Sequence, residues 1–458
     1  MLKIRVGDTI NVVIDAIGSD GSGIARNHEG FVFFIPFSLP GEHVEARVTV
    51  VKKHYGIANV VSISGESKCR VSPPCPWFRR CGGCQLQHCA YDYQLKLKRQ
   101  TVIEAFKRIA HLPSVPEIST CTPSPYVWGY RNKASFPVHR VACGNVTGFF
   151  AKGSHRIIPI NGCMINNSTI DKAFSEISRS LSSIGLDGYS EKSHSGMIRH
   201  ILLRKGVRTS ELLGSFVLLK EPSREQLKSL KNFAVRIKGS LPELVGMTCN
   251  INGKKGNTIL GKESILLEGR NWLNEKICGL LFRYDSTAFF QVNIEQAEAL
   301  FNYVCNEATS DSQCSILELY SGVGVMTSIM AKKVESLTAV EEWIPSIESM
   351  KRNLVLNNIS NVRIIPGKVE EITKKLMSRS YDIVVLDPPR SGCDKQVLSF
   401  LKPVRPRKII YVSCNPATLA RDVSILLSDG EYLIEKIRPF DMFPQTSHVE
   451  TVATIVRV

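Results

Sequence analysis

Short apolar runs alternate with helical patterns in the C-terminal part of the chain. Five runs read as strands: residues 315–319, 338–340, 362–365, 382–386 and 409–412. The segments between them are long enough for helical crossovers, which parallel strands require. From about residue 281 the pattern therefore predicts a doubly wound α/β domain with a parallel sheet.

The first 65 residues have a different pattern. Residues 44–50 alternate apolar with polar side chains, residues 31–36 form a compact apolar run, and Gly18, Gly21 and Gly23 interrupt the sequence between them. Several short strands separated by glycine turns predict a small β-barrel. Barrels of this size often bind oligonucleotides, but the fold alone does not establish that function.

Residues 66–280 should form a central domain. It begins with an irregular, cysteine-rich segment, followed by a helix with Val102, Phe106 and Ile109 on one apolar face. Between Arg79 and Arg108 there are seven Lys or Arg against two acids. Such a run is usually a solvated surface, but the aromatic residues beside it would also suit stacking on bases. Residues 110–280 show mixed strands and helices with no repeat, so we expect an α+β domain.

Composition narrows the function. The net charge of +16 and the pI of about 9.2 favour a polyanionic partner, nucleic acid first. No apolar run approaches the ~18 residues of a membrane span, and the N-terminus lacks a secretory pattern. We therefore expect a cytoplasmic monomer that does not contact membranes. In a reducing compartment its 14 cysteines should serve metal sites, catalysis or packing rather than disulfides.

One strand runs directly into a glycine turn, Tyr320-Ser321-Gly322-Val323-Gly324. Glycines let a ligand approach the backbone, and the next helix presents free N–H groups. The third glycine of a dinucleotide site is missing, while Glu341 ends the next strand about 20 residues later and could accept ribose hydroxyls. This combination favours S-adenosylmethionine over a dinucleotide, although Glu341 would also suit a solvated strand end.

Two other strands stop at prolines, in Asp387-Pro388-Pro389-Arg390 and Cys414-Asn415-Pro416. Parallel strands end at the same edge of the sheet, where ligands bind, so Asp387 and Cys414 should be neighbours. Cys414 is then either a nucleophile or a small buried residue. Glu450, in a polar loop before a final strand at residues 451–458, is either a general base or a surface acid.

The segment Cys75-Pro76-Trp77-Phe78-Arg79-Arg80-Cys81-Gly82-Gly83-Cys84 indicates a metal or cluster site. Its spacing alone favours zinc with four cysteine ligands, and an iron–sulfur cluster is the alternative. Three of the ligands are local, so the fourth would be Cys69, Cys89 or a distant residue such as Cys163.

Taken together, these stretches resemble the RNA uracil-C5 methyltransferase family, which makes 5-methyluridine in ribosomal and transfer RNA. The resemblance is strongest at residues 411–422, 387–390, 75–88 and 289–293. It implies a Rossmann-like class I methyltransferase domain (281–458), an N-terminal barrel of the oligonucleotide-binding or TRAM type (1–65) and the central domain (66–280).

The resemblance also implies functional residues. Cys414 matches the nucleophile and Glu450 the base, and the S-adenosylmethionine contacts correspond to Gln291, Tyr320, Glu341 and Asp387. The ligands of a [4Fe-4S] cluster correspond to Cys75, Cys81, Cys84 and Cys163, in place of the zinc that the spacing favours. Ser321 and Lys368 depart from the family pattern, and Cys69 and Cys89 have no assigned role.

The implied reaction is uracil C5 methylation through a covalent bond from cysteine to carbon 6. The implied barrel and cluster together favour 23S ribosomal RNA as the substrate. Formation of 5-methyluridine in transfer RNA and a non-catalytic role in RNA binding or assembly remain the alternatives.

Overall fold

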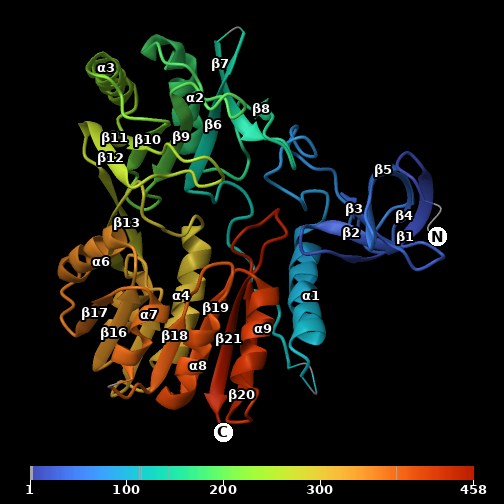
Figure 1. Ribbon diagram of the computed structural model, residues 1–458, viewed down its shortest axis with the longest axis vertical. Coiled ribbons are helices and arrows are strands. Elements are labelled where there is room, and N and C mark those ends of the chain that lie inside the picture. The colour runs from blue at the N-terminus through green and yellow to red at the C-terminus, as the bar shows by residue number, and fades with distance from the viewer. Residues whose placement is uncertain (1–3, 113, 115, 143, 378) are drawn as a thin grey trace.

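The structure is a computed structural model that describes residues 4–112, 114, 116–142, 144–377 and 379–458. Three bodies can be followed in Figure 1: an N-terminal barrel, a central domain and a C-terminal sheet with helices on both faces. In these ranges no helix has both the length and the apolar character needed to cross a membrane.

The N-terminal body confirms the expected barrel. Its strands close in the order β1-β2-β3-β5-β4. Inward-facing residues such as Ile14, Phe33 and Ala46 are at most 2% exposed and alternate with exposed ones, as a half-buried strand requires. The strands are β1 (Thr9–Ile17), β2 (Ser22–Arg26), β3 (Val32–Pro36), β4 (His43–Val51) and β5 (Tyr55–Gly65).

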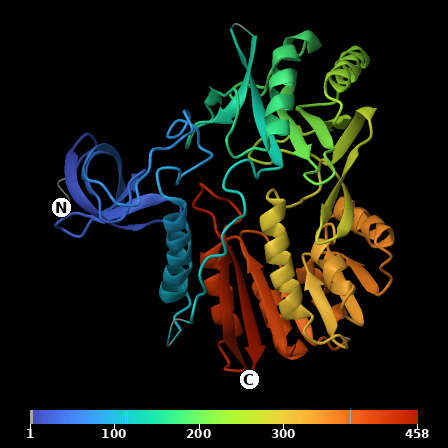
Figure 2. The ribbon, with the colours of Figure 1, turned by 180° about the vertical axis from the view of Figure 1, so that it is seen from behind.

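The helix expected after the cysteine segment is α1 (Tyr91–Ile109). Val102 and Phe106 are fully buried, and they pack into the core of the C-terminal sheet beside α9 (Pro416–Leu426) rather than against the barrel. Figures 1 and 2 both show α1 alongside α9. The helix therefore joins the cysteine segment to the C-terminal domain.

The central domain is built on a mixed sheet with the order β12-β11-β10-β9-β6-β7-β8. Helices α2 (Ser168–Ser180) and α3 (Arg224–Ser240), with the short 3₁₀ helix η1 (Leu181–Ile184), pack into the same apolar core as the sheet. The strands are β6 (Lys133–Val141), β7 (Gly144–Phe150), β8 (Ile157–Pro159), β9 (Ile198–Lys205), β10 (Leu212–Leu218), β11 (Leu244–Ile251) and β12 (Glu263–Gly269).

A separate hairpin of β13 (Trp272–Ile277) and β14 (Leu280–Asp285) follows, and then α4 (Ile294–Ala308). Leu273, Ile277 and Phe282 of the hairpin belong to the apolar core of the C-terminal domain. The boundary expected after residue 280 falls inside β14, which begins at that residue, and both hairpin strands pack into the C-terminal core.

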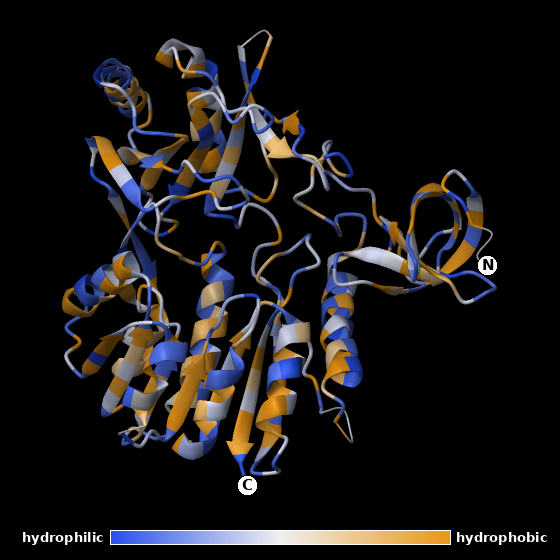
Figure 3. Ribbon diagram, in the orientation of Figure 1, coloured by the Kyte–Doolittle hydropathy of each residue, from blue (hydrophilic) through white to orange (hydrophobic). Residues whose placement is uncertain are grey.

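The C-terminal sheet has the order β17-β16-β15-β18-β19-β21-β20. Successive residues of β18 and β19 enter opposite cores: Val384 and Tyr411 pack with α1, α7, α8 and α9, whereas Val385 and Ile410 pack with α4, α5 and α6. Figure 3 shows the hydrophobic colour concentrated in these strands. This is the two-sided burial that apolar strand runs predict.

The five expected strands are present as β15 to β19, and the final strand expected at residues 451–458 is present as β21. Strand β21 pairs antiparallel with β19 and with the edge strand β20, which was not predicted. The strands of this sheet are β15 (Ser315–Leu319), β16 (Ser336–Glu341), β17 (Val362–Pro366), β18 (Ile383–Leu386), β19 (Lys408–Ser413), β20 (Tyr432–Phe440) and β21 (Glu450–Arg457). The helices between them include α5 (Val325–Ala331), α6 (Ile344–Leu356), α7 (Val369–Leu376) and α8 (Lys395–Val404).

Residues 441–449, here called the strap, link β20 to β21 and contact the rest of the molecule. Figure 1 shows the strap between α1 and the central domain. In the strap, the backbone of Gln445 accepts hydrogen bonds from the amides of Gln85 and Leu86 at 3.1 and 2.9 Å. The side chain of Gln94 bonds to Gln445 twice: it donates to the side-chain Oε1 of Gln445 at 3.0 Å and accepts from the backbone N–H of Gln445 at 3.1 Å.

Further bonds hold the ends of the strap. Tyr130 donates to the carbonyl of Pro444 at 3.0 Å, and Ser447 donates to the carbonyl of Ser19 in the barrel at 2.9 Å. Lys98 forms an ion pair with Asp441 that is almost fully buried, and it also donates to the carbonyl of Phe443 at 3.0 Å. The expectation of a solvated basic face therefore fails at Lys98, whose partner lies 343 residues away.

Lys98→Met should destabilise the protein by about 3–5 kcal/mol, because it leaves the Asp441 carboxylate buried without its cation. Lys98→Met combined with Asp441→Leu should recover most of this loss. Lys351→Met, which breaks the exposed pair with Glu348, should leave the stability almost unchanged. Urea unfolding of the full chain measures all three. Equal losses in Lys98→Met and Lys351→Met would contradict the role assigned to the buried pair.

Candidate active site

The pairing of three C-terminal strands brings Asp387, Cys414 and Glu450 together. Strands β18 and β19 are parallel neighbours, with Leu386 opposite Tyr411, so Asp387 and Cys414 follow their ends at one sheet edge. Strand β21 runs antiparallel to β19, with Thr451 opposite Ser413, which places Glu450 beside Cys414. Glu450 is the first residue of β21 rather than part of the preceding loop. The expected proximity of Asp387 and Cys414 is thus observed.

The environment of these groups favours their neutral forms. Burial first, and then the negative charges of Glu450 and Asp387, raises the pKa of the Cys414 thiol to about 11, while Arg390 opposes the rise. Burial and the charge of Asp387 raise the pKa of Glu450 to about 8, and burial raises the pKa of Asp387 to about 7. In the described part of the chain, Arg390 is the cation that acts on Cys414, and no cation lowers the pKa of Glu450 or Asp387.

Cys414 opens into a cavity rather than a packed core. It is half-buried, and it lines a cavity of about 860 Å³ together with Arg390, Thr446 and His448. The opposite wall comes from the central domain and the cysteine segment. A volume of this size falls in the range of ligand-binding pockets. The sulfur is therefore accessible to a ligand that enters between the domains.

The glycine turn after β15 is shaped by its backbone. Tyr320, Gly322 and Gly324 all have positive φ, and a Cβ on Gly324 would lie only 2.5 Å from Met350. A Cβ on Gly322 would meet no atom within 4 Å, so this side of the turn is open. Ser321 donates through its hydroxyl to the carbonyl of Val340 at 3.0 Å, so serine is compatible with the turn at this position.

Glu341 is fixed at the mouth of this turn. Its two carboxylate oxygens accept hydrogen bonds from the amides of Gly322 and Trp343, both at 2.8 Å. Tyr320 donates to Glu370 at 3.1 Å, and Lys368 lies beside Glu371 at the exposed start of α7. A carboxylate held in this way keeps lone pairs for the two hydroxyls of a ribose.

Gln291 lies in the segment before α4, close to the strap. Its carbonyl accepts from the side chain of Asn132 at 3.1 Å, and two residues later Asn293 donates to the carbonyl of Met442 at 3.2 Å. Gln291, Tyr320 and Glu341 do not line the cavity that contains Cys414. Asp387 is also absent from the lining of that cavity, although its charge acts on Cys414.

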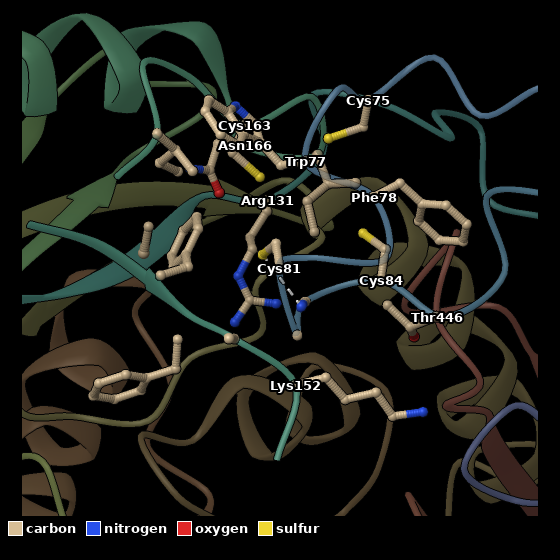
Figure 4. Close-up of a pocket in the computed structure, with 18 of the residues that line it drawn as sticks. Cys75, Trp77, Phe78, Cys81, Cys84, Arg131, Lys152, Cys163, Asn166 and Thr446 are labelled. Carbon is tan, nitrogen blue, oxygen red and sulfur yellow. Dashed lines mark hydrogen bonds between the residues drawn. The ribbon is translucent and has the colours of Figure 1, made fainter. Parts of the chain in front are cut away.

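The four cysteines assigned to a cluster surround one space. Cys75, Cys81, Cys84 and Cys163 all line the cavity that contains Cys414, and Figure 4 shows their sulfurs facing a common region. Burial, and to a smaller extent the neighbouring thiols, raises the pKa of Cys84 to about 12. Cys69 and Cys89, the other possible fourth ligands, do not line this cavity.

Within the described residues, no three His, Cys, Asp or Glu side chains are grouped closely enough to hold a metal ion. A single zinc with Zn–S bonds of ~2.3 Å would draw four sulfurs to within about 4 Å of one another. A four-iron cluster needs a wider arrangement, since each thiolate binds a different iron. The four thiols have the donor type of such a cluster and share one cavity.

Two site residues were not predicted from the sequence. Glu318 on β15 is buried beneath the glycine turn, accepts from Thr327 at 2.5 Å and has a pKa raised to about 8 by burial. In the sequence Arg390 was noted only as part of the motif that begins at Asp387. In the structure its positive charge lowers the pKa of Cys414. The one available signal for Glu318 was an acid inside an otherwise apolar strand.

Glu450→Gln should stabilise the ligand-free protein at high pH. The unfolded chain ionises Glu450 near the ordinary glutamate pKa of 4.5, but the folded chain only near 8, so stability falls between these pH values. The variant should gain nothing at pH ~4 and about 2–5 kcal/mol above pH ~8. Urea unfolding across this range measures the difference. Exposed Glu348→Gln is the control and should show no gain, and a pH-independent effect of Glu450→Gln would contradict the assigned environment.

Comparisons with known proteins identify the family of the chain. Residues 263–458 match the family model described as tRNA (Uracil-5-)-methyltransferase, and residues 3–61 match the TRAM domain. An RNA methyltransferase of Gloeobacter violaceus, described as uncharacterized, is 36% identical over 452 residues, which covers 98% of this chain and 97% of the relative. A Staphylococcus aureus relative with the same description is 34% identical, covering 99% of both chains.

A solved structure extends the likeness to three dimensions. The tRNA (uracil-54, C5)-methyltransferase of Pyrococcus abyssi, in complex with S-adenosyl-L-homocysteine, matches with a TM-score of 0.77 and 27% identity over 97% of this chain and 99% of its own. The predicted fold class, with its methyltransferase domain and TRAM barrel, is therefore confirmed. Similarity along the whole length, together with the family match over the domain that holds Cys414, shows that this chain belongs to the S-adenosylmethionine-dependent RNA (uracil-C5) methyltransferases.

Proposed function

We propose that this enzyme methylates carbon 5 of a uridine in 23S ribosomal RNA through a transient bond between Cys414 and carbon 6 of the base. The observation that carries the proposal is the strand pairing that sets Cys414 between Glu450 and Asp387 at the wall of an open cavity. A nucleophile with a carboxylate beside it is the arrangement that addition followed by proton removal requires.

The reaction begins when the Cys414 thiol gives its proton to water and the thiolate adds to carbon 6 of the uracil. The electron pair of the 5,6 double bond moves into an enolate, so carbon 5 can attack the methyl group of the sulfonium. S-Adenosylhomocysteine leaves as the carbon–sulfur bond breaks. Glu450 then takes the proton from carbon 5, and the sulfur of Cys414 departs as the double bond re-forms.

The methyl donor also changes the electrostatics of the site. S-Adenosylmethionine carries a positive sulfonium, and an added cation lowers the pKa of nearby carboxyl and thiol groups. A sulfonium held near Asp387 would favour ionised Glu450 and the Cys414 thiolate. In this proposal Glu341 binds the ribose, while Gln291, Tyr320 and Asp387 complete the donor site. The target base must leave its stack, at a cost of a few kcal/mol.

Transfer RNA is the second candidate substrate. The Pyrococcus abyssi enzyme is a tRNA methyltransferase, and its likeness covers 97% of this chain, so it includes most of the barrel. The barrel by itself does not separate the two RNA classes. Methylation of unmodified 23S ribosomal and transfer RNA transcripts, followed by mass spectrometry of the nucleosides, tests both. A methyl group at any position other than uridine C5 would contradict the proposed function.

Glu450→Gln should slow product release by about 10²–10⁴-fold, because an amide cannot take the carbon-5 proton. A covalent RNA–protein species should accumulate with S-adenosylmethionine present and appear as a shifted band on a denaturing gel. Cys414→Ala should form no such band and no product, while RNA binding is retained. Cys69→Ala is the matched cysteine control and should turn over normally. A shifted band in Cys414→Ala would rule out its sulfur as the nucleophile.

We further propose that Cys75, Cys81, Cys84 and Cys163 hold a [4Fe-4S] cluster. Bound there, it would tie the cysteine segment to the loop before α2 and fix one wall of the cavity. Protein prepared without oxygen should contain iron and acid-labile sulfide in equal amounts. Cys163→Ala should lose most of the iron, and Cys69→Ala should keep it. Stoichiometric zinc in place of iron would contradict the cluster.

A further inference from the structure

A second cavity lies in the central domain next to the one that contains Cys414. Its volume is about 540 Å³, and the two cavities share Phe150, Ser154, His155 and Ile259 as a common wall. The second cavity is formed by β6, β7, β9 and the segments around residues 189–192 and 256–259. The steps proposed for methyl transfer leave it without a role. A molecule that reaches Cys414 therefore passes beside a second space large enough for part of a ligand.

One side of this cavity is formed by Tyr189 and by the guanidinium of Arg199, which lies over the tyrosine ring. Tyr189 is only 7% exposed and shares a 2.7 Å hydrogen bond with His194. The guanidinium carbon of Arg199 lies 4.9 Å from the centre of the Tyr189 ring. Arg199 itself is held by the carbonyls of Asn252 and Lys254, at 2.6 and 2.9 Å. Tyr189 and Arg199 are thus in place before a ligand arrives, which lowers the entropic cost of binding.

His200 supplies a neutral hydrogen-bonding group. Its Nδ1 lies 3.3 Å from the hydroxyl of Ser135, which lines the first cavity while His200 lines the second. Burial, with a smaller effect from Arg199, lowers the pKa of His200 to about 4, so the ring is neutral near pH 7. Among the described residues, Nε2 of His200 has no hydrogen-bond partner. A neutral imidazole in this state can pair with one polar edge of an uncharged ligand.

Positive charge lies both in the wall and at the rim of the cavity. The buried guanidinium of Arg199 lies in the wall and Lys192 is exposed at the rim, whereas the acid at the edge, Glu191, is paired with His155 at 2.6 Å. Aromatic faces, a neutral hydrogen-bonding group and nearby cations are the features by which proteins hold unstacked bases. Because the second cavity shares a wall with the Cys414 cavity, a nucleotide bound in it would lie close to the target in the RNA.

We infer that this second cavity binds the base of a nucleotide that flanks the target uridine, stacked near Tyr189 and hydrogen-bonded by His200. The inference rests on the proposed function, because it assumes an RNA whose target base enters the first cavity. It adds a determinant of substrate choice that lies outside the methyl-transfer site. One flanking base, in addition to the target, would then leave the RNA stack during recognition.

The test is an abasic scan of a short RNA substrate. Each nucleotide on either side of the target is replaced in turn by one that lacks its base, and kcat/KM is measured. With the wild-type enzyme, one position should reduce kcat/KM by about 10- to 100-fold, the usual effect of losing a stacked base. With His200→Ala, intact RNA should already react about tenfold more slowly, and the same abasic position should cost less than about twofold more.

Two further variants separate loss of the cavity from a general effect on folding. Thr258→Trp fills the cavity from its exposed rim and should abolish sensitivity to the same abasic position. His111→Asn, remote from the cavity, should keep the full wild-type penalty. A flat scan with an active wild-type enzyme, or equal penalties in wild type and His200→Ala, would overturn the inference alone. Failure of the wild type to methylate uridine C5 in intact RNA would overturn the proposed function and this inference with it.

Discussion

The antiparallel pairing of β19 with β21 is the constraint on which the site depends. Opposite ladder residues are only about 5 Å apart, so the register of Ser413 against Thr451 fixes the spacing of Cys414 and Glu450. Neither side chain has to be aimed by a flexible loop, since each adjoins a strand whose interior residues are buried. A one-residue slip would turn Glu450 to the other face of the sheet. Backbone hydrogen bonds between β19 and β21 thus set the spacing of the two side chains.

This placement has an electrostatic cost. Glu450, Asp387 and Glu318 lie near one sheet edge, and burial raises the pKa of each carboxyl group. Acids that share a low-dielectric region cannot all ionise without a compensating cation. A methyl donor with a sulfonium centre has the charge that this edge lacks. The same repulsion that disfavours ionisation in the empty site would therefore help to select a positively charged cosubstrate.

The sequence was most informative where local patterns determine structure. Proline after each strand placed Asp387 and Cys414 at one edge, because parallel strands end together. The position of Glu450 could not be obtained in this way, since the partner of an edge strand is chosen by hydrogen bonds between distant segments. Its catalytic assignment came from the family resemblance and remains a prediction.

The sequence also did not show which charged residues are buried. Lys98 belongs to a basic run that looks solvated, and only the folded chain shows Asp441 beside it. The glycine turn was recognisable from its spacing, yet Glu318 beneath it looked like one polar residue in a strand. Polar groups become informative in the core only when their partners are known, and those partners are seldom close in the sequence.

The bond from Ser447 to Ser19 has a consequence for how such enzymes can change. It joins the barrel to the nine-residue stretch that immediately precedes Glu450. An RNA-binding module attached in this way is not a freely exchangeable adaptor. A lineage that replaced or lost the barrel would also have to rebuild the support of the segment that leads to Glu450, so the barrel and the sheet edge are expected to change together.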